Sequence, residues 1–194
     1  MKTDPKRIAI FASGTGSNAE KMIQYFRQRP EADVVWVGSN KISAPVLAMA
    51  EGYGVWSEAF DKEALHRPEG VLKTFTDRDI DLIVLAGFMI MFPKIILDAF
   101  PDKVVNIHPA LLPKFGGKGM YVMNVHRAVK EAGESQTGIT IHLVNEHYDE
   151  GAIVFQETVA VEDQDSPEQI ARKVQQLEHR FYPEVVGQLL SRQS

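Results

Sequence analysis

The sequence predicts one doubly wound, Rossmann-like α/β domain over residues 1–194, in which a mostly parallel sheet carries an antiparallel C-terminal hairpin. Short β-rich runs alternate with helical patterns along much of the chain, and strands separated by helices pair in parallel. The last two runs are separated only by residues 145–151, too few for a crossover helix, so these strands should pair antiparallel. The predicted strands cover residues 7–12, 33–38, 81–86, 104–107, 137–144 and 152–161, with a further strand starting at Val55.

Helices are predicted between these strands from apolar spacing and from residues typical of helix ends. Gly133 fits the end of one helix. The last helix begins with a capping pattern, because Ser166, Pro167 and Gln169 fit the N-cap, first and third positions. Pro183 is expected to kink or end this helix. The predicted helices cover residues 19–26, 44–51, 61–76, 93–100, 124–132 and a segment from 166 onward.

The composition is that of an ordinary globular protein, with 44% apolar and 24% charged residues. A chain of 194 residues buries about 70% of its unfolded surface, so it needs no disulfide or metal to hold its core. The absence of cysteine excludes disulfides, cysteine-ligated zinc and thiol catalysis. A net charge of −5 without a basic tract disfavours a nucleic-acid partner. Residues 1–7 are polar, unlike a signal peptide, and no apolar run approaches the roughly 18 residues of a membrane span. We expect a cytoplasmic protein with no membrane partner.

The segment between the first strand and the first helix, residues 13–18 (Ser-Gly-Thr-Gly-Ser-Asn), predicts an anion-binding loop. Backbone N–H groups at a helix N-terminus point at an anion, and Ser17 or Asn18 would act as the N-cap. The spacing Gly-x-Gly-x-x-Ala in this segment also fits a dinucleotide fingerprint. That fingerprint requires an acidic residue after the second strand, but Ser-Asn-Lys stands there at 39–41. We therefore favour a single phosphate over NAD; a tight turn without a ligand is the alternative.

Asn106 and His108 lie two residues apart where a short apolar strand gives way to Pro109. Residues i and i+2 of a strand project from the same face, so the amide and the imidazole should lie side by side. The amide can donate to a developing oxyanion, and the imidazole can carry a proton near neutral pH. Asp149, in the hairpin loop, adds a carboxylate at another strand end. The set fits attack on a carbonyl group; a buried polar pair that holds a loop in place is the alternative.

Four segments in register resemble the folate-dependent formyltransferase family, in particular its members that act on glycinamide ribonucleotide. They are the loop 13–18, the string Leu-Ala-Gly-Phe-Met at 85–89, the string Asn-Ile-His-Pro-Ala-Leu-Leu-Pro-Lys at 106–114, and the pattern Gln-x-x-Glu-His-x-x-Tyr-Pro at 175–183. The resemblance extends from about residue 7 to residue 186. It implies transfer of the formyl group of the co-substrate 10-formyltetrahydrofolate to the amine of glycinamide ribonucleotide. The products would be formylglycinamide ribonucleotide and tetrahydrofolate, in de novo purine biosynthesis.

The same resemblance implies the residues of the site. The catalytic residues would be Asn106, His108 and Asp149. Asp149 would raise the pKa of His108, so that protonated His108 helps Asn106 to stabilise the oxyanion and then helps a proton to reach the departing folate nitrogen. The ribotide phosphate and ribose would be bound by Gly16, Ser17, Asn18, Gln175 and Glu178. The folate would be bound by Met89, Ile90, Met91, Phe92, Asn145, Glu146, His147 and Tyr148. No metal is expected, since no spacing of histidines and carboxylates fits a metal site.

Two positions depart from the family pattern. An arginine often follows the Phe-Met pair in the family, whereas this chain has Ile90 there. The flexible, Gly-rich segment 116–122 is longer than in many members, so the lip beside the folate tail should differ. Three further histidines are interpreted as structural or surface residues: His126, His142 and His179.

Other activities compete with this one. Formyltetrahydrofolate hydrolase and methionyl-tRNA formyltransferase share the Asn-x-His and Asp core but normally carry a further domain, for which we expect 194 residues to leave no room. A nucleotide-binding module without catalysis is disfavoured by the missing acidic residue. An inactive family member is disfavoured because all three catalytic positions are retained. The protein is expected to be a monomer or a homodimer.

Overall fold

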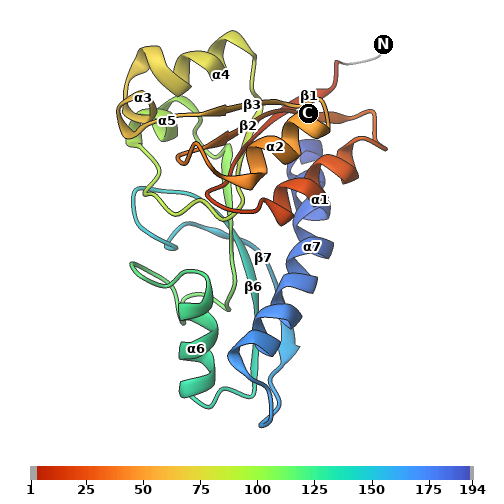
Figure 1. Ribbon diagram of the computed structural model, residues 1–194, viewed down its shortest axis with the longest axis vertical. Coiled ribbons are helices and arrows are strands. Elements are labelled where there is room, and N and C mark those ends of the chain that lie inside the picture. Colours follow the sequence, from red (N-terminus) through yellow and green to blue (C-terminus); the bar gives the residue numbers. More distant parts are fainter. Residues whose placement is uncertain (1–3, 193–194) are drawn as a thin grey trace.

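The computed structural model describes residues 4–192 as a seven-stranded mixed sheet between helices (Figure 1), which confirms the predicted fold class. Residues 1–3 of the polar N-terminal segment lie outside the described residues, as do 193–194. The strand order is β3-β2-β1-β4-β5-β6-β7. Strands β1 to β5 pair in parallel, and β6 pairs antiparallel with β7, as predicted. Strand β6 also pairs antiparallel with β5, which the sequence did not predict. The strands are β1 (Lys6–Phe11), β2 (Ala32–Ser39), β3 (Trp56–Ala59), β4 (Leu82–Leu85), β5 (Val104–His108), β6 (Gln136–Leu143) and β7 (Ile153–Ala160).

Helices cover both faces of the sheet. One apolar cluster includes residues of α1, α2 and α7, and a second includes residues of α3, α4 and α5. Within residues 4–192 no helix combines the length and apolar composition needed to cross a bilayer. The helices are α1 (Ser17–Phe26), α2 (Pro45–Gly52), α3 (Lys62–His66), the π-helical turn η1 (Pro68–Leu72), α4 (Lys73–Asp77), α5 (Lys94–Ala99), α6 (Met123–Glu131) and α7 (Pro167–Arg192).

Strand β1 shows why both faces are covered. Its β-branched and aromatic residues favour a strand, and successive side chains point to opposite faces. Ile8 and Ile10 join the cluster that includes α1, α2 and α7, whereas Ala9 and Phe11 join the cluster that includes α3, α4 and α5. All four side chains are fully buried, as in a central parallel strand. The polar segment 13–18 therefore begins only after β1 has ended.

The start of α1 differs from the prediction. Its N-cap is Gly16, with a left-handed φ of 79°, and Ser17 is already the first helical residue. A side chain at Gly16 would place its Cβ 2.2 Å from Val46 Cγ2 at the start of α2. The prediction that Ser17 or Asn18 caps the helix is therefore wrong, because the tight turn against α2 requires glycine at the cap.

Two further helix predictions need correction. The segment predicted as one helix over 61–76 is broken by Pro68 and by the non-helical backbone of Gly70. In contrast, α7 continues through Pro183 to Arg192, although an interior proline typically costs about 3 kcal/mol. The neighbouring Tyr182 offsets this cost, because it is fully buried and its hydroxyl lies 2.9 and 3.1 Å from the carbonyl oxygens of Leu85 and Val105.

Candidate active site

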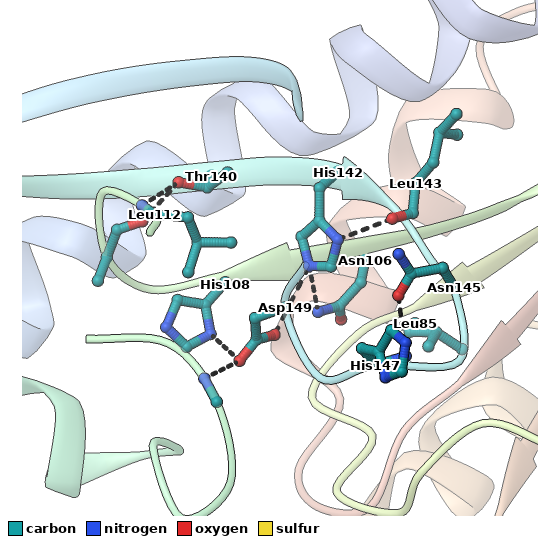
Figure 2. A network of polar contacts seen from close by, with 12 residues as sticks. Leu85, Asn106, His108, Leu112, Thr140, His142, Leu143, Asn145, His147 and Asp149 are labelled. Atoms are coloured by element: carbon teal, nitrogen blue, oxygen red, sulfur yellow. Dashed lines mark hydrogen bonds and ion pairs between the residues drawn. The ribbon is translucent and has the colours of Figure 1, made fainter. Parts of the chain in front are cut away.

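The candidate site lies at the carboxyl end of β5, where side chains of β5 and β6 meet (Figure 2). The antiparallel register places His142 of β6 opposite Asn106 and Thr140 opposite His108. The Thr140 hydroxyl donates to the Ala110 carbonyl over 2.7 Å and accepts from the Leu112 N–H over 3.0 Å. These bonds fix the chain just after His108 and so hold the end of β5 in place.

A β-bulge in β7 adjoins this point. Ile141 pairs with Phe155, but the next residue, His142, pairs with Ile153, so that Val154 is an extra residue in β7. Bulges bend a strand locally and re-aim side chains beside active sites. Here the bulge lies at the base of the hairpin loop that carries Asp149.

Asn106 and His142 form the first pair of the cluster (Figure 2). The Asn106 amide nitrogen Nδ2 donates to His142 Nε2 over 3.1 Å, and His142 Nδ1 donates to the Leu143 carbonyl over 2.9 Å. Both bonds fit a neutral imidazole with its proton on Nδ1. His142 is hydrogen-bonded within its strand, as predicted, but its bond to Asn106 also makes it part of the site.

Asp149 lies between the two imidazoles (Figure 2). Its Oδ2 is 3.5 Å from His108 Nδ1 and accepts from the Gly117 N–H over 2.9 Å, while its Oδ1 is 3.6 Å from His142 Nε2. Burial raises the pKa of this carboxyl, but the two imidazoles and the Gly117 N–H together outweigh burial and lower it. Asp149 is therefore a carboxylate at neutral pH.

His108 is almost fully buried, and its Nε2 donates to the Phe115 carbonyl over 2.7 Å. Burial lowers the pKa of His108 and outweighs Asp149 and the Phe115 carbonyl, which raise it. The expectation that Asp149 raises the pKa of His108 is correct for the effect of Asp149 by itself. It is wrong for the net shift, because burial makes that shift downward, and it is therefore wrong for the expected protonated His108. His108 is neutral at neutral pH, with its Nδ1 free to accept a proton beside Asp149.

A second set of polar residues joins the start of α1 to the middle of α7. Asn18 Nδ2 donates to Glu178 Oε2 over 3.0 Å, and Gln175 Nε2 donates to Ser17 Oγ over 3.4 Å. Burial raises the pKa of Glu178, against the opposing effect of Asn18. The four residues predicted to contact the ribotide from these two helices are thus brought together, and Gly16 stands beside them as the N-cap of α1.

A cavity of about 620 Å³ is lined by residues of both sets. It is lined by Asn106, His108 and Asp149 and by three of the predicted ribotide residues, Asn18, Gln175 and Glu178. Gly16 and Ser17 are not part of the lining. Within residues 4–192 no group of three or more histidines and carboxylates could hold a metal ion.

The residues predicted for folate lie around the same cavity, with one exception. Seven of them line it: Met89, Ile90, Met91, Phe92, Asn145, His147 and Tyr148. Glu146 does not, and its carboxylate lies 3.1 Å from Lys94 Nζ at the start of α5. Ile90 packs against the apolar cluster of α3, α4 and α5, so this position supplies no charge to the cavity.

The structure adds lining residues that the sequence did not single out as site residues. His126 of α6 is 6% exposed, and its Nδ1 has no partner among the described residues. Burial lowers its pKa to about 4, so the ring is neutral near pH 7. The lip, residues 116–122, lines the cavity from Gly117 onward. The alternation of β6 places Thr140 and His142 on one face, but only the register with β5 brings His142 opposite Asn106.

Comparison with known proteins identifies the family. A family model described as formyl transferase matches residues 6–186. The chain is 39% identical over 188 residues to the phosphoribosylglycinamide formyltransferase, chloroplastic, of Arabidopsis thaliana, a match that covers 94% of this chain and 64% of that protein. The Vigna unguiculata protein of the same name is 37% identical, with 61% of its length covered. The chain thus spans less than two thirds of these two relatives. Its match to phosphoribosylglycinamide formyltransferase of Bacillus subtilis (strain 168), at 33% identity, covers 95% of both chains.

Solved structures agree with the sequence matches. The crystal structure of phosphoribosylglycinamide formyltransferase from Bacillus halodurans superposes with a TM-score of 0.87 at 35% identity and covers 97% of both chains. That of the Brucella melitensis protein gives a TM-score of 0.86 at 35% identity over 96% of both chains. Together with the geometry at the end of β5, these matches show that the chain belongs to the formyl transferase family, in the group of the phosphoribosylglycinamide formyltransferases.

Proposed function

We propose that this protein transfers the formyl group of 10-formyltetrahydrofolate to the amine of glycinamide ribonucleotide in purine biosynthesis. One observation carries the proposal: Asn106, His108 and Asp149 share a cavity with the polar contact between α1 and α7. An amide donor, a neutral imidazole and a carboxylate are the groups that acyl transfer to an amine requires. The names of the relatives supply the formyl acceptor, and the resemblance of the sequence to the folate-dependent formyltransferases supplies the donor.

The chemistry assigns a separate task to each side chain. When the amine attacks the formyl carbon, negative charge develops on the formyl oxygen, and Asn106 Nδ2 donates to it. Neutral His108 accepts the proton that the amine loses, directly or through water, and Asp149 stabilises the imidazolium from 3.5 Å. His108 then returns the proton to the folate nitrogen as the bond between carbon and nitrogen breaks. The proton count balances, and no metal is needed.

The binding residues follow from the same cavity. Asn18, Gln175 and Glu178 line it. Together with Gly16 and Ser17 at the N-terminus of α1, which favours an anion, they would bind the ribotide phosphate and ribose. Residues 89–92 and the hairpin loop around Tyr148 would hold the folate, since their exposed apolar side chains can cover an aromatic ring. The cytoplasmic location and the oligomeric state stay predictions.

Formyl transfer in vitro tests the proposal. Purified protein is mixed with 10-formyltetrahydrofolate, or its stable dideaza analogue, and release of the deformylated folate is followed by absorbance with and without glycinamide ribonucleotide. Release that requires the ribonucleotide is the expected result. Release without it would identify a hydrolase instead, and no release would contradict a catalytic role. His108→Ala, assayed in parallel, shows whether any release comes from this site.

A further inference from the structure

Ser13 joins the two regions of the cavity that are proposed to hold different substrates. It follows β1 and opens the Gly-rich loop 13–16 that leads to α1. Its side chain is 3% exposed, and its hydroxyl bonds to groups of two other loops. The cavity lining described above does not include it, and no catalytic task falls to it.

The hydrogen bonds of Ser13 reach two other loops. Its Oγ donates to Asn40 Oδ1 over 2.7 Å, just after β2, and accepts from the Met89 N–H over 3.2 Å, just after β4. Its own N–H donates to the Gly87 carbonyl over 3.1 Å. One residue of the Gly-rich loop is therefore bonded twice to the segment that carries the proposed folate residues.

This segment has few other polar attachments. Among the hydrogen bonds of residues 4–192, the bond from Met89 to Ser13 is the only one made by the backbone of residues 88–92. Its remaining anchors are apolar, since the rings of Phe88 and Phe92 lie 5.1 and 5.0 Å from the ring of Phe11. The Ser13 hydroxyl thus fixes the backbone position of Met89, which the apolar contacts alone do not define.

The Gly-rich loop is also fixed on its other side. The Gly14 carbonyl accepts from the Val46 N–H over 3.2 Å, and Gly16 packs closely against the Val46 side chain. A ligand that orders the N-terminus of α1 therefore orders a loop that is tied to α2 on one side and, through Ser13, to Met89 on the other.

We propose that Ser13 is a positioning residue that couples the ribonucleotide site to the folate site. This inference rests on the proposed function. A ligand that orders residues 13–18 removes part of the cost of ordering residues 87–92, so each ligand increases the affinity for the other by the same factor. Loss of the hydroxyl uncouples the two sites while both remain present.

The test measures this factor directly. The Kd of a folate analogue with carbon at position 10, which cannot transfer a formyl group, is measured by calorimetry with and without saturating glycinamide ribonucleotide. For the wild-type protein we expect about fivefold or more tighter binding with the ribonucleotide, the lower end of usual coupling. For Ser13→Ala the factor should fall below about twofold. A residue that only supports the fold would change Tm without changing this ratio.

Ser39→Ala is the matched control. Ser39 is also fully buried at a strand end, but its Oγ accepts from the Lys41 N–H over 3.2 Å, within its own segment. It should keep the wild-type factor. If Ser13→Ala fails to fold, Asn40→Ala takes its place. It keeps the bond from Met89 but removes the acceptor that orients the Ser13 hydroxyl, so a factor between those expected for Ser13→Ala and the wild type should result.

A coupling factor in Ser13→Ala equal to that of the wild type would overturn the inference, and so would an equal loss in Ser39→Ala. Binding of both ligands to the wild type without coupling would overturn it as well and leave the proposed function standing. Binding of neither ligand would overturn both.

Discussion

The two sides of the cavity are built from different kinds of backbone. The catalytic side chains of β5 and β6 are held by a regular ladder, and His108 and His142 are almost fully buried. The lip has no regular structure, and left-handed φ values occur at Gly117, Gly119 and Val122. The side chains of Tyr121 and Val122 are 51% and 53% exposed.

The rigid strand ends and the irregular lip suit two different requirements of an enzyme. Oxyanion stabilisation and proton transfer depend on donors held in fixed positions, which a sheet provides. Contact with the outer part of a ligand tolerates variation, which a loop provides. We therefore expect changes at the strand ends to reduce turnover, and changes in the lip to alter KM.

The largest expected effect comes from removing a catalytic side chain. Asn106→Ala and His108→Ala should each lower turnover about 10²–10³-fold or more, as loss of an oxyanion-hole donor does elsewhere, with little change in Tm. Single-turnover formyl transfer and thermal unfolding measure the two effects. His66→Ala, which alters an exposed histidine of α3, should keep full turnover. Near-full activity in either catalytic variant would contradict the assignment.

Asp149→Asn should reduce the maximum rate by about 10²-fold, since it removes the group that stabilises the imidazolium. Asp149 raises the pKa of His108, so its loss lowers that pKa further. The rate is lost when His108 becomes protonated, and the acidic limb of the kcat/KM profile should therefore move to lower pH. A limb that moves to higher pH, or does not move, would show that Asp149 does not act through His108.

Tyr121→Ala tests the lip alone. Truncating this half-exposed side chain removes about 1 kcal/mol of contact, so KM for the folate should rise about fivefold with kcat unchanged. Steady-state kinetics at saturating ribonucleotide give both constants. A fall in kcat as large as that of His108→Ala would remove the distinction between the two sides.

The smallest effect is on stability and not on rate. The folded-state pKa of His126 is lowered to about 4 from 6.5, so below pH 6.5 the unfolded chain binds a proton that the folded chain does not. The contribution of neutral His126 to the stability of the fold is therefore complete above pH 6.5 and is lost as the pH falls toward 4. His126→Gln should reduce the acid-induced drop in Tm by a few degrees, since each kcal/mol shifts Tm by about 2–4 °C in a chain of this size. Equal drops in Tm for variant and wild type between neutral and mildly acidic pH would contradict this.

The sequence predicts the strand side of the cavity better than the loops. The alternating side chains of β5 were sufficient to pair Asn106 with His108, whereas Asp149 joined them as a catalytic candidate through the family resemblance. His142 was not placed in the site, because its position depends on the register between β5 and β6, and a pattern along one strand does not fix that register.

The errors in the helices have tertiary causes. Gly16 caps α1 because Val46 of α2 lies too close for any side chain, and no local signal carries that contact. Helix α7 passes Pro183 because Tyr182 is anchored at the ends of β4 and β5. The direction of the His108 pKa also escapes the sequence, since it depends on how deeply the ring is buried.

The bulge at Val154 sets the direction in which the hairpin loop leaves the sheet. Deleting the extra residue would leave the pairs on either side of it in register, but it would remove the local bend of the strand. The loop that carries Asp149 would then leave β7 at a different angle, and the distances from its carboxylate to His108 and His142 would change. The length of this hairpin is therefore constrained during evolution by the position of the Asp149 carboxylate, and not only by the pairing of the two strands.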